Sequence, residues 1–221
     1  MRIRLILAAG IAGIAAMLAL AGTGEAQKPP KAGSVTLKAS AGQLTYSAPV
    51  TLTGKVKGAK AGVVVSLERR AADATAFVPA GTATTDGQGD YTFTQRPAQS
   101  SVFRAVAATT PPATSADVPV AVAPLVGLKV SDATPRKGQR VRFKGTVRPQ
   151  HDGTRVAIQR KKADGTWATV KTPILTDAGS TYSRYAKRFR IRRSGTYRTV
   201  IAAHADHAEG VSRERTLTVG G

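Results

Sequence analysis

The chain has 221 residues, of which 42% are hydrophobic, and it carries a formal net charge of +20 at pH 7. This length is enough for more than one domain with a hydrophobic core of its own. The chain contains no cysteine, which excludes disulfides, thiolate metal sites and thiol nucleophiles.

The first 26 residues are predicted to be a signal peptide. Residues 1–4 are basic, residues 5–21 form an apolar run, and small residues place cleavage after Ala21 or Ala26. The alternative is an N-terminal membrane anchor, for which the apolar run is barely long enough, since a span takes roughly 20 residues. We therefore expect an exported protein, secreted or associated with the cell envelope, without a membrane span after cleavage.

After a flexible segment at residues 27–33, apolar and polar residues alternate in short runs separated by turns rich in Gly, Pro and Asp. This pattern is typical of half-buried antiparallel strands. A first unit is predicted at residues 34–123. Its seven strands are expected at residues 35–39, 50–56, 63–70, 76–85, 90–95, 102–107 and 118–122.

A second unit, residues 124–221, repeats the first. The run Val50-Thr51-Leu52-Thr53-Gly54-Lys55-Val56 reappears 91 residues later as Val141-Arg142-Phe143-Lys144-Gly145-Thr146-Val147. Strands are expected at residues 127–131, 141–147, 154–161, 167–171, 182–192, 196–202 and 212–219. A period near the size of a small domain indicates two copies of one fold.

Seven short strands in about 100 residues are what an immunoglobulin-type sandwich needs. The sequence therefore predicts an all-β protein: two tandem seven-stranded immunoglobulin-like β-sandwiches after an N-terminal signal peptide. In the repeated strand, alternate residues face the core. The shared Gly54 and Gly145 weaken that strand, so each is predicted to mark a bulge or a close approach of an opposing side chain.

Three segments resemble the tandem immunoglobulin-like domains of exported bacterial proteins: residues 50–56, the turn at residues 85–93 and residues 194–198. The resemblance implies extracellular, non-catalytic modules and carries over no catalytic residue. It also implies that Tyr197 forms a tyrosine corner by bonding upstream backbone, while the first unit has Phe103 in that place. Trp167 follows the third strand, so it is not the core Trp of antibody domains.

Few residues suggest catalysis or metal binding. The only histidines are His151, His204 and His207. A zinc site uses such donors, but His204 and His207 fall in a predicted loop where no helix places both rings on one face, which favours a solvated loop. Asp86 and Asp90 supply too few oxygens for calcium, so a hairpin turn is favoured. No nucleophile elbow or phosphate-binding glycine loop is present. We expect no enzyme, no cofactor and no metal.

The positive charge is concentrated in the second unit. Residues 27–125 hold 10 Lys and Arg against 5 acids, whereas residues 126–221 hold 21 against 7. On two strands predicted to be neighbours in one sheet, basic residues alternate with core residues and should share one outer face. These candidate polyanion-binding residues are Arg140, Arg142, Lys144, Arg188, Arg190 and Arg192. The corresponding face of the first unit carries Thr51, Thr53, Thr92 and Thr94.

The basic face suggests binding of an anionic envelope polymer or polysaccharide, because a guanidinium group can bond both oxygens of a phosphate or carboxylate. Nucleic acid is expected to bind only non-specifically, because no aromatic residues interleave the patch for base stacking. Simple solubilisation of an exposed face is the alternative reading of the charge. The predicted function is thus an exported, non-catalytic module with a structural or adhesive role at the cell envelope. The alternative is a carbohydrate-processing or metal-dependent enzyme fragment or accessory domain.

Overall fold

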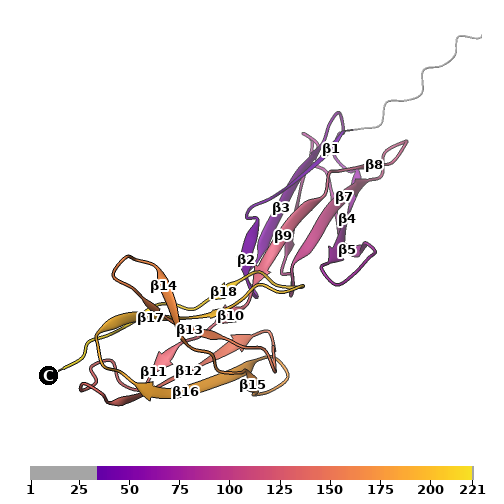
Figure 1. Cartoon of the computed structure of the whole chain (residues 1–221). Helices are drawn as coiled ribbons and strands as arrows, with labels where there is room; N and C mark the ends of the chain where they lie inside the picture. Colours follow the sequence, from indigo (N-terminus) through magenta and orange to yellow (C-terminus); the bar gives the residue numbers. More distant parts are fainter. Residues whose placement is uncertain (1–33, 221) are drawn as a thin grey trace, which may run out of the picture. The chain divides into compact units, whose positions relative to one another are not determined.

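The computed structural model describes residues 34–220, and Figure 1 shows that part of the chain as strands joined by loops. The predicted signal peptide at residues 1–26 and the flexible segment at residues 27–33 lie outside the described residues. Within residues 34–220 all regular elements are strands, and they form four sheets. The sheets of β1 to β9 share no hydrogen-bonded strand with those of β10 to β19.

The first sandwich consists of a three-stranded and a six-stranded sheet. The smaller has the order β1-β3-β6, and the larger has the order β2-β9-β7-β4-β5 with β8 paired to β7. All pairs are antiparallel except β2 with β9, which is parallel. The strands are β1 (Val35–Ala39), β2 (Gln43–Thr45), β3 (Val50–Val56), β4 (Val64–Ala71), β5 (Val78–Thr84), β6 (Asp90–Gln95), β7 (Ser101–Ala107), β8 (Ala113–Thr114) and β9 (Val118–Ala123).

The second sandwich consists of two five-stranded sheets. One has the order β10-β12-β16-β15 with β11 also paired to β12, and the other has the order β14-β13-β17-β18 with β19 also paired to β17. The strands are β10 (Leu125–Val126), β11 (Lys129–Val130), β12 (Arg140–Arg148), β13 (Ala157–Lys161), β14 (Trp167–Lys171), β15 (Thr176–Asp177), β16 (Ser183–Arg190), β17 (Gly195–Ile201), β18 (Gly210–Val211) and β19 (Arg215–Leu217).

The expected all-β sandwich architecture is confirmed, and the differences concern short strands. The sequence did not predict β2, β8 or β15, each of two or three residues. Such segments are too short to show an alternation of apolar and polar residues. They form because a neighbouring strand offers free backbone N–H and C=O groups. The strands expected at residues 127–131 and 212–219 are observed as the shorter β11 and β19, and the two-residue strands β10 and β18 that precede them were not predicted.

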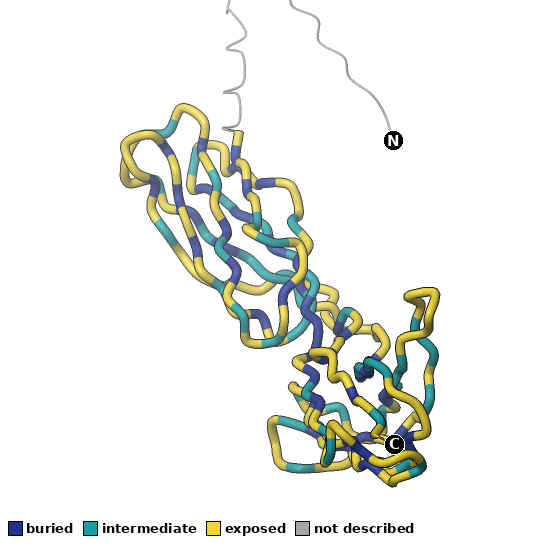
Figure 2. The backbone as a smooth tube through the Cα atoms, turned by 90° about the vertical axis from the view of Figure 1, so that its left-hand side faces the viewer, coloured by how far each residue is buried: buried dark blue, intermediate teal, exposed yellow. Residues whose placement is uncertain are grey.

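The core follows the alternation of the repeated strand. In β3 the side chains of Val50, Leu52 and Val56 are buried, and β12 repeats this with Val141, Phe143 and Val147. Figure 2 shows buried and exposed residues alternating along the strands of both sandwiches. Each sandwich has its own hydrophobic cluster, in which residues from both sheets pack face to face.

A glycine, a tyrosine and a backbone carbonyl meet in the same way in both sandwiches. Gly54 in β3 lies opposite Tyr91 in β6, and the Tyr91 hydroxyl donates to the Thr36 carbonyl at 2.5 Å. A Cβ at Gly54 would lie 2.0 Å from that same carbonyl oxygen and 2.3 Å from the Tyr91 hydroxyl. The glycine therefore marks the predicted close approach of an opposing side chain.

The second sandwich repeats this contact. Gly145 in β12 lies opposite Tyr185 in β16, whose hydroxyl donates to the Gly127 carbonyl at 2.8 Å. The Tyr185 hydroxyl also lies 2.8 Å from the Thr199 hydroxyl in β17, so it joins the two sheets. A Cβ at Gly145 would lie 1.9 Å from the Gly127 oxygen.

The prediction that Tyr197 forms a tyrosine corner is wrong, because the described part of the chain shows no hydrogen bond from the Tyr197 hydroxyl to upstream backbone. Among residues 34–220, the tyrosine hydroxyls that bond upstream backbone are those of Tyr91 and Tyr185. Tyr197 instead packs its ring edge against Phe143, at 5.1 Å between centroids. The carbonyl that Tyr185 reaches belongs to Gly127, 58 residues upstream between β10 and β11, and the sequence around Tyr185 does not indicate this partner.

Residues 34–220 contain no helix that is long and apolar enough to span a bilayer.

Candidate functional site

The predicted basic face lies on β12 and β16. The register places Arg140 directly opposite Arg190 and Arg142 directly opposite Arg188, and all four side chains are exposed. Val141 and Phe143 in β12 and Tyr185 in β16, at the alternate positions, are buried in the core, so these four share the outer face of the sheet. Lys144 continues the row opposite Ala186. Five of the six predicted residues are thus brought together.

The register does not place the sixth residue on this face, and it adds two others. Arg192 is exposed but lies beyond the end of β16, after the buried Ile191. Lys129 in β11 lies opposite Lys144, and Arg184 lies opposite Thr146. A strand carrying Lys129 was expected at residues 127–131, but the sequence does not give its register against β12, so Lys129 was not included in the face. Arg184 follows the same alternation as Arg188 and Arg190, so the pattern could have identified it.

The first sandwich has threonines where the second has arginines. Thr51 lies opposite Thr94 in β3 and β6, at the positions that Arg142 and Arg188 hold in β12 and β16. The expected pair Thr53 and Thr92 follows directly beside them. One sandwich therefore carries neutral cross-strand pairs on this face, and the other carries pairs of like charge.

The basic side chains of the face have no acidic partners. Within residues 34–220, no ion pair joins Arg140, Arg142, Lys144, Arg188 or Arg190 to a carboxylate. Arg190 reaches only the Gly138 carbonyl, at 3.4 Å. The positive charge of the face is thus available to an external anion.

An open groove of about 1510 Å³ extends onto this face. Its only carboxylate is that of Glu209, and the remaining charged groups are basic. They are Lys129, Arg142, Lys144, Arg148, Arg184, Arg213 and Arg215. A concave surface lined by one sign of charge raises the local concentration of the opposite charge.

Most aromatic–cation contacts lie on the other sheet of each sandwich. The Arg198 guanidinium stacks 4.2 Å from the Trp167 ring centroid, and the Arg104 guanidinium stacks 4.0 Å from that of Phe77. Both arginines also bond a C-strand side chain, Arg198 with Gln159 and Arg104 with Glu68. These rings are occupied by intramolecular contacts, so they offer no stacking platform beside the basic face.

Asp86 and Asp90, for which a hairpin turn was favoured over a calcium site, make hydrogen bonds and an ion pair within the first sandwich. One Asp86 oxygen accepts the backbone N–H groups of Gln88 and Asp90, both at 2.9 Å. The Asp90 carboxylate pairs with Lys55 at 3.0 Å. The two carboxylates thus shape and anchor a turn.

A second cluster of polar side chains contains all three histidines. His204 and His207 flank a two-residue turn between β17 and β18, and each backbone N–H donates to the carbonyl of the other, at 3.0 and 3.1 Å. Residues paired in this way project their side chains to the same side of the ribbon. The expectation of a solvated loop with separated rings is therefore wrong, since a turn aligns the rings without a helix and His207 is only 4% exposed.

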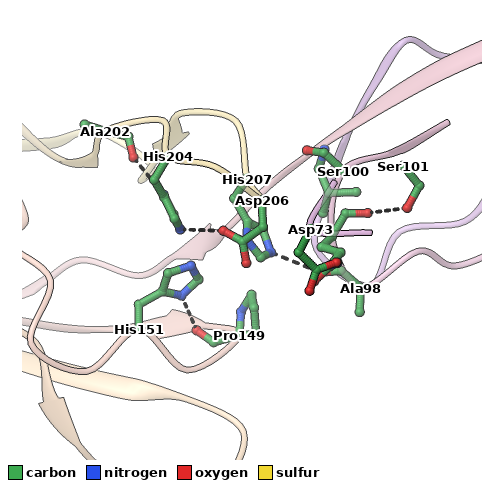
Figure 3. A network of polar contacts seen from close by, with 12 residues as sticks. Asp73, Ala98, Ser100, Ser101, Pro149, His151, Ala202, His204, Asp206 and His207 are labelled. Atoms are coloured by element: carbon green, nitrogen blue, oxygen red, sulfur yellow. Dashed lines mark hydrogen bonds and ion pairs between the residues drawn. The ribbon is translucent and has the colours of Figure 1, made fainter. Parts of the chain in front are cut away.

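His151 joins them from the loop between β12 and β13. Its backbone N–H donates to the Ser183 hydroxyl at 2.7 Å, which fixes the loop. The His151 ring centroid lies 4.8 Å from that of His204 and 5.0 Å from that of His207. Figure 3 shows the three rings converging from these two segments, with Asp206 between them.

Each ring is held by a backbone carbonyl on one nitrogen (Figure 3). His151 Nδ1 lies 2.7 Å from the Pro149 oxygen, His204 Nδ1 lies 3.2 Å from the Ala202 oxygen, and His207 Nε2 lies 3.0 Å from the Ala98 oxygen. A carbonyl only accepts, so each of these nitrogens carries the proton and donates it. In a neutral ring the second nitrogen is then an unprotonated donor of an electron pair.

Burial lowers the pKa of His151 below its ordinary value, and the charges of His207 and His204 act in the same direction, although the bond to the Pro149 carbonyl opposes them. The neutral form of this ring is thereby favoured.

The two sheets of each half, their antiparallel order and the parallel pairing of β2 with β9 define the chain as two immunoglobulin-like β-sandwiches in tandem. No known protein-family model and no curated protein matches the chain. Among solved structures, murine CEACAM1b aligns with 85% of this chain and 100% of its own, at 14% sequence identity and a TM-score of 0.34. The fold assignment therefore rests on the sheet topology.

Proposed function

We propose that the protein is an exported, non-catalytic immunoglobulin-like module with a structural or adhesive role at the cell envelope, and that it binds anionic polymers through its basic face. That face is defined as Arg140, Arg142, Lys144, Arg188 and Arg190, with Lys129 and Arg184 at its margin. The apolar leader pattern and the resemblance to exported bacterial repeats support export.

The observation that carries the binding proposal is the direct opposition of Arg140 with Arg190 and of Arg142 with Arg188. Like charges directly opposite each other across two strands destabilise a sheet. A face built this way, without carboxylates to neutralise it, is better suited to an external anion than to the stability of the fold. Solubility alone would be served equally well by basic residues spaced apart.

The ligand class that fits is a linear polymer with phosphate, sulfate or carboxylate groups. A flat row of guanidinium groups can bond successive anionic groups in pairs. Because such binding releases counterions, affinity should fall steeply as salt rises.

The test is binding of the untagged protein to immobilised heparin, and to double-stranded DNA as a second polyanion, over a series of salt concentrations. A quadruple variant replaces four basic-face residues by glutamine. Its substitutions are Arg142→Gln, Lys144→Gln, Arg188→Gln and Arg190→Gln. We expect at least a tenfold loss of heparin affinity and a shallower salt dependence.

A charge-matched control removes four exposed lysines from other surfaces. Its substitutions are Lys38→Gln, Lys57→Gln, Lys60→Gln and Lys171→Gln. This control should bind heparin nearly as well as the parent chain. Equal losses in both variants would mean that net charge alone governs binding, and the assignment to this face would be rejected.

A further inference from the structure

We propose that His151, His204, His207 and Asp206 form a binding site for a divalent transition metal ion, and that Zn²⁺ is the ion that the donors fit best. This histidine cluster lies in the second sandwich, on different residues from the basic face, so it constitutes a separate site. Its members come from the loop between β12 and β13 and from the turn between β17 and β18.

The donor set is the first argument. One potential ligand atom from each of the three histidines lies within 4.8 Å of the others. The Asp206 carboxylate oxygen Oδ1 lies 3.2 Å from His204 Nε2 and 3.1 Å from His207 Nδ1. Three imidazole nitrogens and one carboxylate oxygen make a tetrahedral set of the kind that Zn²⁺ takes.

The outer contacts of the rings are the second argument. Metal-bound histidines generally donate their other ring N–H to a backbone carbonyl or carboxylate, which fixes the tautomer and aims the ligating nitrogen. All three rings here have such a carbonyl partner, on Pro149, Ala202 and Ala98. Their remaining nitrogens are thereby directed into the cluster.

The electrostatics of His207 are the third argument. Its side chain is nearly fully buried, and its Nδ1 makes no hydrogen bond although the Asp206 carboxylate lies 3.1 Å away. With Nε2 donating to Ala98, a neutral His207 turns an electron pair toward a carboxylate oxygen. Two electron-rich atoms at this distance repel each other unless a cation lies between them, and a buried polar atom without a partner is costly.

The cluster must contract to bind the ion. Zinc–nitrogen bonds of about 2.0–2.1 Å bring two ligand nitrogens to roughly 3.4 Å from each other. The side chains that can move are those of His204 and Asp206, which are 32% and 36% exposed. His207 and its carbonyl partner can stay in place as the fixed point of the site.

A site with four protein ligands leaves no open position, which is the arrangement of structural zinc. Here the ion would join two loops at one end of the second sandwich, between residues 56 positions apart in the chain. The chain has no cysteine, so no disulfide can make such a link. The metal would supply this cross-link and stabilise both loops.

The test is isothermal titration calorimetry of the untagged, metal-free protein with Zn²⁺. All histidines of the chain belong to the cluster, so no other histidine site can contribute heat. We expect one Zn²⁺ per chain, and at least a tenfold weaker affinity for His204→Gln and His151→Gln. Asp117→Asn, which removes an exposed carboxylate elsewhere, is the matched control and should bind like the parent chain.

Cobalt substitution provides a second readout. Co²⁺ in a four-coordinate nitrogen and oxygen site absorbs strongly in the visible range, and this absorption should appear with one equivalent of Co²⁺ and disappear when Zn²⁺ displaces it. Circular dichroism checks that each variant is folded. Absence of zinc binding, or binding unaltered in both histidine variants, would show that the cluster holds only protons and would overturn the proposal.

Discussion

At the scale of single residues, the most specific feature of the repeat is a glycine that leaves no room for a side chain. Gly54 and Gly145 occur in the middle of strands that otherwise favour β-branched and aromatic residues, where glycine is unfavourable. The reason is the tyrosine opposite each glycine, whose ring lies over it to reach a backbone carbonyl, that of Thr36 in β1 or that of Gly127 between β10 and β11. The sequence predicted either a bulge or the close approach of a side chain at these glycines, and the structure contains the close approach.

The identity of that side chain could not be predicted. Tyr91, Tyr185 and Tyr197 all follow the core-facing parity of their strands, and only the three-dimensional position of a distant carbonyl separates them. The histidine cluster illustrates the same limit. Residues 151 and 204 are far apart in the chain, and their meeting depends on which loops share an end of the sandwich.

Replacing Gly145 by alanine should severely destabilise the second sandwich. The new Cβ would lie 1.9 Å from the Gly127 carbonyl oxygen, which is backbone and cannot rotate away. Overpacking of this kind costs about 1–3 kcal/mol, and a backbone clash belongs at the upper end. Urea denaturation followed by the fluorescence of Trp167, the only tryptophan, measures the loss in that sandwich. Gly220→Ala, in the same sandwich, is the control, because nothing lies within 4 Å of its Cβ position, and a similar loss there would refute the steric explanation.

At the scale of elements, the equivalent strand pairs β3–β6 and β12–β16 carry different residues on their outer faces, threonine in the first sandwich and arginine in the second. Alternation in the sequence was sufficient to predict β3, β6, β12 and β16 and to separate their core and outer faces. The register that sets arginine against arginine followed only from the structure, because it depends on the lengths of the connections. The outer faces therefore differ in charge while the buried faces stay alike.

Exchanging the cross-strand pairs should separate stability from binding. The double substitution Arg142→Thr with Arg188→Thr copies the Thr51–Thr94 pair of the first sandwich and removes repulsion between opposed charges. We expect the second sandwich to gain about 0.5 kcal/mol, with a larger gain at low salt, while heparin affinity falls.

The reverse exchange is the control for this prediction. Thr51→Arg with Thr94→Arg should destabilise the first sandwich by a similar amount and strengthen heparin binding. Urea denaturation at two salt concentrations measures the stability of each variant, and heparin chromatography measures its binding. If the Arg-to-Thr variant lost stability, opposed arginines would not be a cost to the fold.

At the scale of the whole molecule, each sandwich depends on a buried tyrosine that must stay protonated. Tyr91 and Tyr185 occupy equivalent places, and each is 3% exposed. Burial raises the pKa of Tyr91 to about 12 and that of Tyr185 to about 12, the latter despite its bond with Thr199. The free energy of unfolding of both sandwiches therefore depends on whether the buried tyrosine hydroxyl of each keeps its proton.

Both sandwiches should lose stability together in alkali. In the unfolded chain these hydroxyls ionise near pH 10, whereas in the folded chain they stay neutral to about pH 12, so their contribution is fully present below pH 10 and is lost as the pH rises toward 12. Each pH unit in that window should remove up to about 1.4 kcal/mol of stability for each tyrosine.

Urea midpoints measured between about pH 8 and pH 11 check this. Tyr185→Phe should be less stable at pH 8 but should decline less steeply, whereas Tyr46→Phe should decline like the parent chain. An unchanged slope in Tyr185→Phe would show that this buried hydroxyl does not set the alkaline limit of the fold.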